Sequence, residues 1–579
     1  MNILGVNCYG HDSSATILVN GVPVCAVEEE RFLRVKHTGV FPENAIRCCL
    51  ELAGLRGPDL DAVGFYWDPT VHRGKQAMHL LRYLPASLHL LRGRSQTARL
   101  LAGIKPKLAE FLSIPAAKIH YVEHHLAHAA SAFFVSPFES AAILSYDGVG
   151  EWTTTLYGVG EGNQMEKRGE VFFPHSLGNF YSMLTEYLGF KCAGGEGKVM
   201  GLAAYGDPNP YYDRLRSIIQ VGEHGQYRLD TSYLRYHTHG RYGWYSPKLV
   251  EMLGPSRRAE SEMTQQYQDI AAAAQKVVEE VTLELLRWHH QQVRMPRLTI
   301  GGGIGLNSVV NGRIIAETPF QEVFIQPAAN DASGSFGAAF YLWNQVFKQP
   351  RVYEMTHAYL GPSVDDATHR AAIESEGLPY TTLEREQLVE RAATMLAEGK
   401  IIGWFQGRME FGPRALGNRS ILAAPFPASM KDTINARVKH REHFRPFAPS
   451  LPIERLSEYF EHDYVSPFML LVYKTRVEKR ATIPAVDHVD GTGRVQSLRR
   501  SDNPLYYDLI VRFGEKAGVP VLLNTSFNVR GEPIMNTPEQ AIECFLGEDM
   551  DGLVLGSHFL DKAAVPAAKR KSGGAKALD

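Results

Sequence analysis

The chain has 579 residues, which is too long for a single hydrophobic core, so two or three domains are expected. Its 61 Lys and Arg residues against 63 Asp and Glu residues give a formal net charge of -2 without any long run of one sign, which argues against binding to nucleic acid. No uncharged apolar run reaches the roughly 18 residues of a membrane span, and the six cysteines lack disulfide or metal spacing, so we expect a cytoplasmic protein.

The N-terminal part of the chain repeats one pattern of strands and turns. The first copy is predicted at residues 3–7, 10–14, 15–19, 20–21 and 22–28. The second copy is predicted at residues 141–146, 147–151, 153–159 and 160–163, with a third strand after residue 165. Such an internal repeat predicts two related lobes. It resembles the paired ribonuclease-H-like lobes of the acetate kinase, sugar kinase, heat-shock chaperone and actin superfamily, which hold nucleotide phosphates between their turns.

Between the two copies lies a largely apolar segment, residues 80–101, that contains four arginines. We interpret it as a helical insertion that covers the first lobe, with binding to a membrane surface as the alternative. A short strand over residues 119–122 then leads to His124 and His128, which are spaced four apart. Two His at this spacing on a helix point the same way and suit a metal ion, although a satisfied pair on a helix face is the ordinary alternative.

A long amphipathic helix over residues 270–285 precedes a strand at 298–300 and a glycine-rich turn at 301–308. Glycines between a strand and a helix allow backbone N–H groups to approach phosphate or ribose, while a merely tight turn is the alternative. The composition changes near residues 349–360. We therefore predict domains over 1–350 and 351–562, and a flexible tail over 563–579 for which no function is evident.

The second predicted domain contains arginines next to Gly, Pro and Phe, in blocks at residues 410–420, 439–449, 490–494 and 523–528. Guanidinium groups match the geometry of phosphate and carboxylate, so these blocks predict a binding site for a phosphorylated anion. A network of surface salt bridges is the alternative.

Several blocks agree in order and spacing with one known family. They lie at residues 10–15, 28–32, 36–37, 124–128, 175–178 and 196–203, and in the arginine-rich blocks above. On these blocks the chain resembles the O-carbamoyltransferases of the NodU and tobramycin carbamoyltransferase type over nearly its whole length. The resemblance implies an α/β fold, with a duplicated ribonuclease-H-like N-terminal domain and a C-terminal domain similar to the YrdC-like threonylcarbamoyl-adenylate synthases.

The resemblance also implies two successive reactions. The C-terminal domain joins carbamoyl phosphate to ATP, held with Mg²⁺, to form carbamoyl-adenylate and pyrophosphate, and the N-terminal domain transfers the carbamoyl group to a hydroxyl of a small-molecule acceptor. Cationic side chains suit the first step because they offset charge on both anions. By motif position, the residues that bind carbamoyl phosphate and ATP are Arg414, Lys439, Arg445, Arg494, Asn524, Ser526 and Asn528, of which Lys439 and Arg445 are also catalytic.

In the N-terminal domain the resemblance implies a metal ion between His124, His128, Asp147 and Asp331. These donors suit Fe(II), Mn(II) or Zn(II), and the family points to Fe(II). His11 is the candidate base or carbonyl polariser, with a turn-capping role as its alternative, and Lys36 is a further catalytic candidate. Nucleotide contacts are expected from Asp12, Lys198, Gly302, Gly303 and Asn307.

Two other functions fit part of this pattern. A threonylcarbamoyl transferase acting on tRNA shares the lobes and the metal site, but the chain lacks a basic stripe. A nonenzymatic ATP-driven clamp, as in the heat-shock chaperones, needs neither the metal site nor the arginine-rich site. The matched blocks do not identify the acceptor, and a homodimer is left open. Residues 80–101 and 222–258 are candidate walls of the acceptor pocket or an ordinary lid, the latter segment containing Tyr233, Tyr236, His237, His239, Tyr242, Trp244 and Tyr245.

Overall fold

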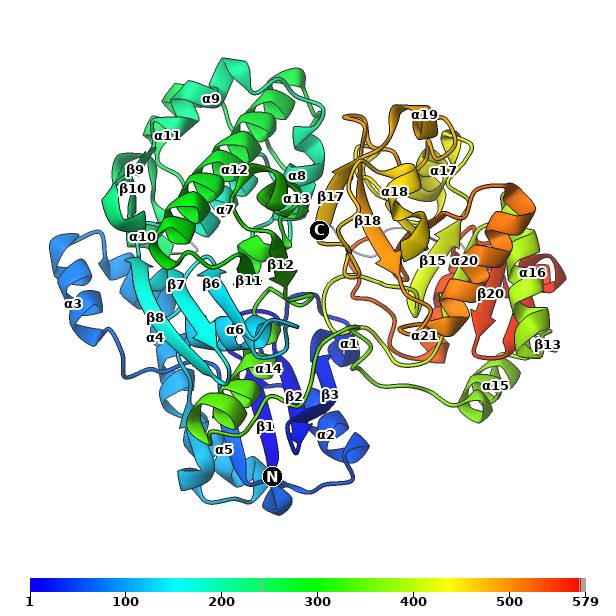
Figure 1. Cartoon of the computed structure of the whole chain (residues 1–579), viewed down its shortest axis with the longest axis horizontal. Coiled ribbons are helices and arrows are strands. Elements are labelled where there is room, and N and C mark those ends of the chain that lie inside the picture. Colours follow the sequence, from blue (N-terminus) through cyan, green and yellow to red (C-terminus); the bar gives the residue numbers. More distant parts are fainter. Residues whose placement is uncertain (241–242, 572, 574–579) are drawn as a thin grey trace. The chain divides into compact units, whose positions relative to one another are not determined.

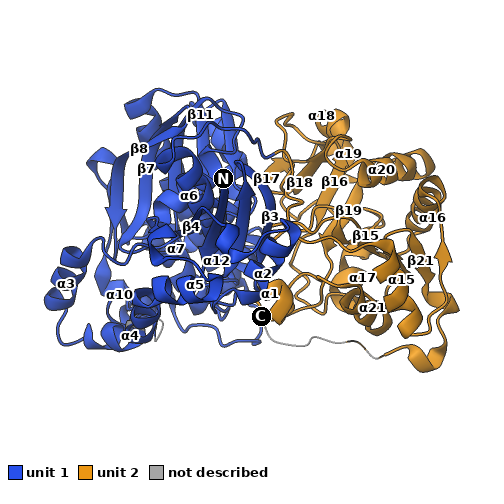
Figure 2. Ribbon diagram, turned by 90° about the horizontal axis from the view of Figure 1, so that it is seen from below, with its two compact units in different colours: residues 1–29, 37–355 blue, residues 30–36, 356–579 orange. Residues whose placement is uncertain are grey.

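The computed structural model describes residues 1–240, 243–571 and 573 (Figure 1). The chain forms two compact units, shown in blue and orange in Figure 2. Unit 1 consists of Met1–Glu29 and His37–Met355, and unit 2 consists of Glu30–Lys36 and Thr356–Asp579. Tyr242 and the last six residues of the predicted tail lie outside the described residues.

Unit 1 contains two five-strand sheets of the same topology. The first has the order β3-β2-β1-β4-β5, and β1 is antiparallel to β2 but parallel to β4. The second has the order β8-β7-β6-β11-β12, and β6 is antiparallel to β7 but parallel to β11. The predicted duplication of a ribonuclease-H-like fold is therefore confirmed. The strands are β1 (Asn2–Asn7), β2 (Ser14–Val19), β3 (Val22–Glu28), β4 (Ala62–Phe65), β5 (Ile119–Tyr121), β6 (Ser140–Tyr146), β7 (Thr153–Glu161), β8 (Gln164–Phe172), β11 (Arg297–Gly301) and β12 (Glu322–Ile325).

Two short helices connect these sheets at the centre of unit 1. Helices α6 (His124–Phe133) and α14 (Ser333–Phe340) pack against each other, α14 also lies against β1, and α6 also lies against β11. Both helices are rich in small residues, Ala and Ser in α6 and Ala, Gly and Ser in α14, which lets their backbones approach closely. A methyl group on Gly337 would overlap the carbonyl oxygen of Ala127, so this packing requires a glycine. The start of α6 and the turn before α14 are thereby held beside the ends of β1 and β6.

The remaining helices of unit 1 are inserted between these elements. The segment predicted as a helical insertion is helical, and its helix α4 packs against α10 from the second candidate wall. The long helix predicted over residues 270–285 is part of α12. The other elements are α2 (Glu43–Leu52), α3 (Arg73–Arg82), α4 (Leu88–Ala102), α5 (Ile104–Leu112), α7 (Leu177–Tyr187), α8 (Glu196–Ala203), α9 (Asn209–Arg216), β9 (Ile219–Val221), β10 (Tyr227–Leu229), α10 (Tyr236–His239), α11 (Pro247–Leu253), α12 (Gln265–Val293) and α13 (Ser308–Glu317).

Unit 2 is an α/β domain built on a mixed sheet of nine strands, in the order β13-β21-β20-β14-β15-β19-β16-β18-β17. Helices α16 and α20 pack together, and their apolar faces form the core with Trp404 and Val554 of the sheet. The strands are β13 (Thr381–Thr382), β14 (Ile402–Phe405), β15 (Arg419–Ala423), β16 (Ala448–Pro452), β17 (Leu471–Lys474), β18 (Thr492–Leu498), β19 (Leu522–Ser526), β20 (Gly552–Leu555) and β21 (His558–Asp561). The helices are α1 (Glu30–Leu33), α15 (Asp366–Ser375), α16 (Arg385–Ala397), α17 (Ser429–Arg437), α18 (Leu456–Tyr459), α19 (Val477–Arg480), α20 (Pro504–Ala517) and α21 (Pro538–Gly547).

Among the described residues, none of the helices combines the length and the apolar character needed to cross a bilayer.

Candidate active sites

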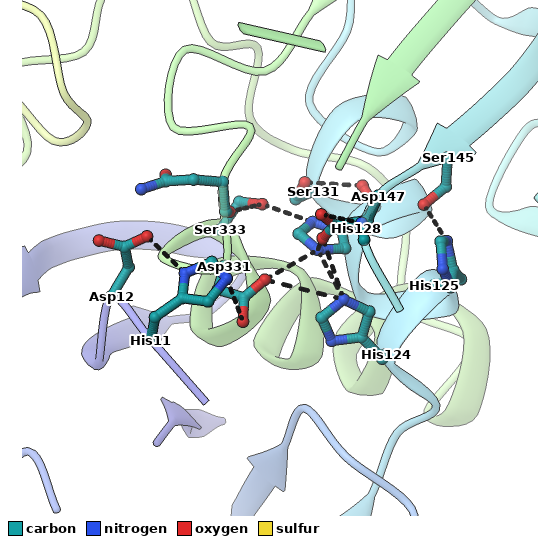
Figure 3. A network of polar contacts seen from close by, with 12 residues as sticks. His11, Asp12, His124, His125, His128, Ser131, Ser145, Asp147, Asp331 and Ser333 are labelled. Atoms are coloured by element: carbon teal, nitrogen blue, oxygen red, sulfur yellow. Dashed lines mark hydrogen bonds and ion pairs between the residues drawn. The ribbon is translucent and has the colours of Figure 1, made fainter. Parts of the chain in front are cut away.

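The four residues predicted to bind a metal come together in unit 1 (Figure 3). His124 and His128 lie on the first two turns of α6, Asp147 directly follows β6, and Asp331 lies just before α14. The Nε2 atoms of both histidines are 3.2 Å from Oδ2 of Asp147, and they are 3.8 and 3.7 Å from Oδ1 of Asp331. The four potential ligand atoms lie within 4.8 Å of one another, and all four residues are buried.

The donor chemistry of this group fits a divalent cation. Two carboxylates are buried together, and the two imidazole Nε2 atoms approach each other to 3.1 Å. Burial lowers the pKa of His128, but hydrogen bonds to Asp147 and Asp331 outweigh it and raise the pKa to about 9. Burial raises the pKa of Asp147, and the two histidines reverse this and bring the pKa well below its ordinary value. A bound cation would offset the negative charges of the two buried carboxylates. The combination of nitrogen and oxygen donors suits Fe(II), Mn(II) or Zn(II).

Neighbouring side chains fix the orientation of this group. His128 Nδ1 is 3.0 Å from the hydroxyl of Ser333, so its Nε2 faces the carboxylates. His125 is a third histidine in the same block but points elsewhere, with its ring nitrogens 2.8 Å from Ser145 Oγ and 3.0 Å from the carbonyl of Thr153 (Figure 3). Histidines that bind metals commonly have a partner on the second ring nitrogen, as His128 has in Ser333.

Glu151 supports the same group, although no sequence pattern predicted a role for it. Its buried carboxylate accepts hydrogen bonds from the backbone N–H of His124 at 3.0 Å and of Asp68 at 2.7 Å. Helix α6 has no capping side chain of its own at Glu123, so Glu151 caps it from the loop that carries Asp147. The position of His124 is thereby coupled to that of Asp147.

His11 lies beside this centre and is held by Asp12. Its Nδ1 is 2.8 Å from Asp12 Oδ2, and its Nε2 is 3.7 Å from Asp331 Oδ2. The second oxygen of Asp12 is 2.7 Å from Nδ1 of His37. Asp12 was predicted to contact nucleotide, but in the structure both of its oxygens have histidine partners. Burial lowers the pKa of His11, and the charges of Asp331 and Asp12 outweigh it and raise the pKa well above its ordinary value.

The glycine-rich turn after β11 packs directly on the metal-binding group. Gly302 has a φ of 89°, and a methyl group there would overlap the carbonyl oxygen of Tyr146. The side chain of Asn307 caps α13 by accepting from Val310 N, and it pairs with Gln275 at 3.1 Å. Lys198 is buried in α8 with its Nζ 5.4 Å from the ring centre of Phe190. Nucleotide contact by Asn307, Lys198, Gly302 and Gly303 stays a prediction, and the amide of Asn307 already has partners.

In unit 2, several predicted anion-binding arginines converge. Burial and the charge of Arg445 lower the pKa of Arg414 to about 10. Burial lowers the pKa of Arg494 well below its ordinary value, as do the charges of Arg414, Arg441 and Arg445. The Nε atoms of Arg414 and Arg494 are buried without a hydrogen-bond partner in the described part of the chain. We call Arg414, Arg441, Arg445 and Arg494 the arginine cluster. The mutual repulsion of their positive charges and the buried Nε groups of Arg414 and Arg494 favour a bound anion.

The loop that carries Arg414 is organised by Glu410. The buried carboxylate Oε1 of Glu410 accepts from the backbone N–H groups of Leu416 at 2.7 Å and Asn418 at 2.8 Å. Arg419 is fully buried, and its guanidinium carbon lies 3.6 Å from the ring centre of Phe405. Not every arginine of this block therefore faces a ligand, because Arg419 has a packing role.

Lys439 is hydrogen-bonded to two other predicted binding residues, Ser526 and Asn528. It is 3% exposed, and its Nζ donates to the carbonyl of Ser526 at 2.8 Å and to the carbonyl and Oδ1 of Asn528, both at 2.6 Å. Burial lowers the pKa of Lys439, and Arg441 is the next cause. Asn524 is buried in the sheet, where its amide donates to Gln496 at 3.0 Å. The geometry favours positioning roles for Lys439 and Asn524 over direct contact with a ligand.

Two further cations belong to this region of unit 2. Lys36, predicted as a catalytic residue, is part of unit 2, and its charge contributes to the lowered pKa of Lys439. Arg530 was not singled out by the sequence; its Nη2 is 3.6 Å from Oε1 of Glu442. Glu442 also lies 3.9 Å from Arg445, so this carboxylate lies near the guanidinium groups of both Arg445 and Arg530. The spacing Asn528-Val529-Arg530 in a loop after a strand was the available signal for Arg530.

Comparison with known proteins identifies the family of the chain. Residues 2–340 match the family model for the carbamoyltransferase N-terminus, and residues 393–562 match the one for the carbamoyltransferase C-terminus. The chain belongs to the carbamoyltransferase family. It is thus a transferase of carbamoyl groups, and the resemblance seen in its sequence is confirmed.

The chain is similar to several individual proteins. Nodulation protein NolNO of Sinorhizobium fredii is 38% identical over 96% of this chain and 80% of its own length. The 3'-hydroxymethylcephem-O-carbamoyltransferase of Amycolatopsis lactamdurans is 35% identical over 46% of this chain and 49% of its own length. The solved structure of HypF from T. kodakarensis is 13% identical with a TM-score of 0.32, and the match covers 60% of this chain and 48% of that one.

Proposed function

We propose that the chain is an ATP-dependent O-carbamoyltransferase that forms carbamoyl-adenylate in unit 2 and transfers its carbamoyl group to a small-molecule hydroxyl in unit 1. The observation that carries this proposal is the presence on one chain of two different groups of side chains, one suited to anions and one suited to a divalent cation. One is the arginine cluster, in which the Nε atoms of Arg414 and Arg494 are buried without a hydrogen-bond partner among the described residues, and the other is a four-residue donor group beside an oriented histidine. A chaperone-like clamp needs neither.

In unit 2, the proposed first reaction brings two polyanions together. Carbamoyl phosphate gives its phosphoryl group to water, and the remaining carbamate oxygen attacks the α-phosphorus of ATP, so that phosphate and pyrophosphate are released. Arg414, Arg445 and Arg494 would bind these anions, because their buried guanidinium groups can offset the charge that two phosphorylated substrates bring. Lys439 and Asn524 would hold the strand and loop that shape the site, and Mg²⁺ would accompany the nucleotide.

In unit 1, the proposed second reaction is attack of an acceptor hydroxyl on the carbonyl carbon of carbamoyl-adenylate, with AMP leaving. Asp12 holds Nδ1 of His11, and Nε2 is 3.7 Å from Asp331, whose charge raises the pKa of His11. A cation that neutralises Asp331 would remove this effect, and Nε2 of His11 would then accept the hydroxyl proton. Asp12 has this role because its other oxygen is fixed by His37. Gly302, Gly303 and Asn307 would border the nucleoside, and Lys198 would meet its phosphate.

His124, His128, Asp147 and Asp331 would hold the divalent cation, for which we propose Fe(II), with Mn(II) and Zn(II) as alternatives. Such a cation, when bound, would neutralise Asp147 and Asp331 and offset the adenylate phosphate, which improves AMP as a leaving group. Ser333 and Glu151 keep the two histidines directed at this point.

We propose a hydroxyl-bearing natural product or oligosaccharide as the acceptor, because a relative of this chain is a cephem O-carbamoyltransferase and another is a nodulation protein. The helical insertions are the proposed walls of its pocket. Trp67 packs on His124 with ring centres 5.5 Å apart, and Gln76 of α3 donates to the carbonyl of Glu151 at 3.3 Å. The chain just before residues 80–101 therefore lies next to the donor group, and within that segment Tyr83 packs on His237.

The test is to incubate the full chain with ATP, Mg²⁺, Fe(II) and a panel of hydroxyl acceptors, with and without carbamoyl phosphate. We expect AMP and pyrophosphate to form only when carbamoyl phosphate is present, together with a carbamoylated acceptor detected by its mass. Formation of ADP, or of AMP without dependence on carbamoyl phosphate, would contradict the proposal. Carbamoylation of tRNA in place of the small acceptors would favour the threonylcarbamoyl transferase alternative.

A further inference from the structure

The segment Glu30–Lys36 belongs to unit 2, although it lies more than 300 residues before the remainder of that unit. It contains α1 and three cations, namely Arg31, Arg34 and Lys36. In unit 2, its arginines contact the backbone of two loops that carry residues of the proposed adenylate-forming site. We call these the first loop, residues 406–418, and the second loop, residues 527–537.

Arg31 contacts the first loop. It is only 2% exposed, its Nη2 donates to the carbonyl of Gly412 at 2.8 Å, and its Nη1 is 2.9 Å from Oε1 of Glu30. Gly412 lies two residues before Arg414 of the arginine cluster. The carboxylate of Glu410 holds the other side of the same loop at Leu416 and Asn418, so Arg414 projects from a loop that is fixed on both sides.

Arg34 contacts the second loop in the same way. Its Nη1 and Nη2 donate to the carbonyls of Ile534 and Pro533, both at 2.7 Å. Asn528 begins this loop, donates through its side-chain amide to the carbonyl of Glu532 at 2.6 Å, and accepts from Lys439. Arg34 and Lys439 therefore hold the two ends of a loop whose middle contains Arg530.

Stability alone does not account for these two arginines. A buried ion pair such as Arg31 with Glu30 is often no more stabilising than an apolar pair of similar volume. A guanidinium group, however, fixes the direction of the carbonyl that it binds, because its N–H groups form a rigid plane. Here the carbonyls so fixed belong to the two loops that present Arg414 and Asn528.

We infer that the segment Glu30–Lys36 completes the adenylate-forming site of unit 2, with Arg31 and Arg34 as positioning residues for its two loops. The inference rests on the proposed function of that site. It means that residues 356–579 alone lack part of the site, and that the segment serves the first reaction although it is surrounded in sequence by residues of unit 1.

The test uses full-length chains with Arg31→Ala, Arg34→Ala, Arg34→Lys and, as a matched surface control, Arg56→Ala, whose side chain is 84% exposed. Two reactions are measured separately: pyrophosphate release that depends on carbamoyl phosphate, and transfer from supplied carbamoyl-adenylate to the acceptor. Displacing catalytic loops by about 1 Å typically lowers a rate about 100-fold. We expect such a loss of pyrophosphate release in both Ala variants, partial recovery in Arg34→Lys, and unchanged transfer in all four.

Wild-type pyrophosphate release in folded Arg31→Ala and Arg34→Ala would overturn the inference and leave the proposed function intact. Equal loss of both reactions with an intact circular dichroism spectrum would also overturn it. Failure of the wild-type chain to release pyrophosphate would instead remove the proposed function itself. If Arg31→Ala does not fold, the Arg34 pair decides, because that side chain is 23% exposed and its replacement is better tolerated.

Discussion

Replacement of Glu151 by alanine should weaken metal binding in unit 1 without touching a metal-binding side chain. The Glu151 carboxylate is 4% exposed and accepts from the N–H groups of His124 and Asp68. Its removal leaves the buried N–H of His124, which Glu151 caps at the start of α6, without an acceptor, and this costs about 1–3 kcal/mol. Because His124 then loses its fixed position relative to Asp147, metal affinity should fall about 10- to 100-fold.

The assay is a competition titration of Zn(II) between the chain and a chromophoric chelator, with folding followed by circular dichroism. Glu151→Gln keeps an acceptor oxygen and should lose less affinity than Glu151→Ala. Glu161→Ala removes an exposed glutamate of the neighbouring strand and should bind as the wild type does. The reasoning is refuted if folded Glu151→Ala binds Zn(II) with wild-type affinity.

The remaining predictions concern three single residues. Carboxylates raise the pKa of His128 to about 9 in the metal-free chain, so a metal must displace a proton from this residue. The affinity for Zn(II) should therefore rise with pH up to about 9. An affinity independent of pH would contradict the assignment of His128 as a metal ligand. Protonation of His128 also contributes to the stability of the metal-free fold, because its pKa is higher in the folded chain than the ordinary 6.5. This contribution is complete below pH 6.5 and is lost as the pH rises through 9, which thermal melts should show as a fall in melting temperature. Lys439→Met should lower pyrophosphate release about 100-fold while transfer from carbamoyl-adenylate persists, and equal loss of both activities would exclude its role in the first reaction. Gly302→Ala should reduce the free energy of unfolding, measured in urea, by about 2–5 kcal/mol, because Gly302 has a positive φ and a methyl group there would overlap Tyr146. Gly197 has open space around it, so Gly197→Ala should not lower the stability. Equal stabilities of the two variants would contradict the packing argument.

The sequence predicted the duplicated fold because the signals are local. Strands such as β1 and β6 are short apolar runs that end at glycine or acidic turns, and the same order occurs twice. The His124 and His128 pair was visible because both residues lie on one helix. Their convergence with Asp147 and Asp331 was expected only from the resemblance to a family.

Other features depend on contacts between distant residues, which no local pattern reveals. Glu151 reaches Asp68 across 83 positions, and Arg31 reaches Gly412 across 381. The boundary predicted near residue 350 treats each domain as continuous, whereas the structure assigns Glu30–Lys36 to unit 2. Asn307 and Asn524 were assigned to ligands by motif position, but the structure shows that helix capping and sheet packing use the same amide groups.

The central claim is that one chain makes carbamoyl-adenylate and then consumes it, and the fate of the carbamate oxygen tests this most directly. Carbamoyl phosphate is labelled with a heavy oxygen isotope at both carbamate oxygens and incubated with the chain, ATP and an acceptor. If a carbamate oxygen attacks the α-phosphorus and the acceptor then attacks carbon, AMP keeps that oxygen. We predict one heavy oxygen in the phosphate of AMP by mass spectrometry. Unlabelled AMP formed together with a carbamoylated acceptor would contradict the account.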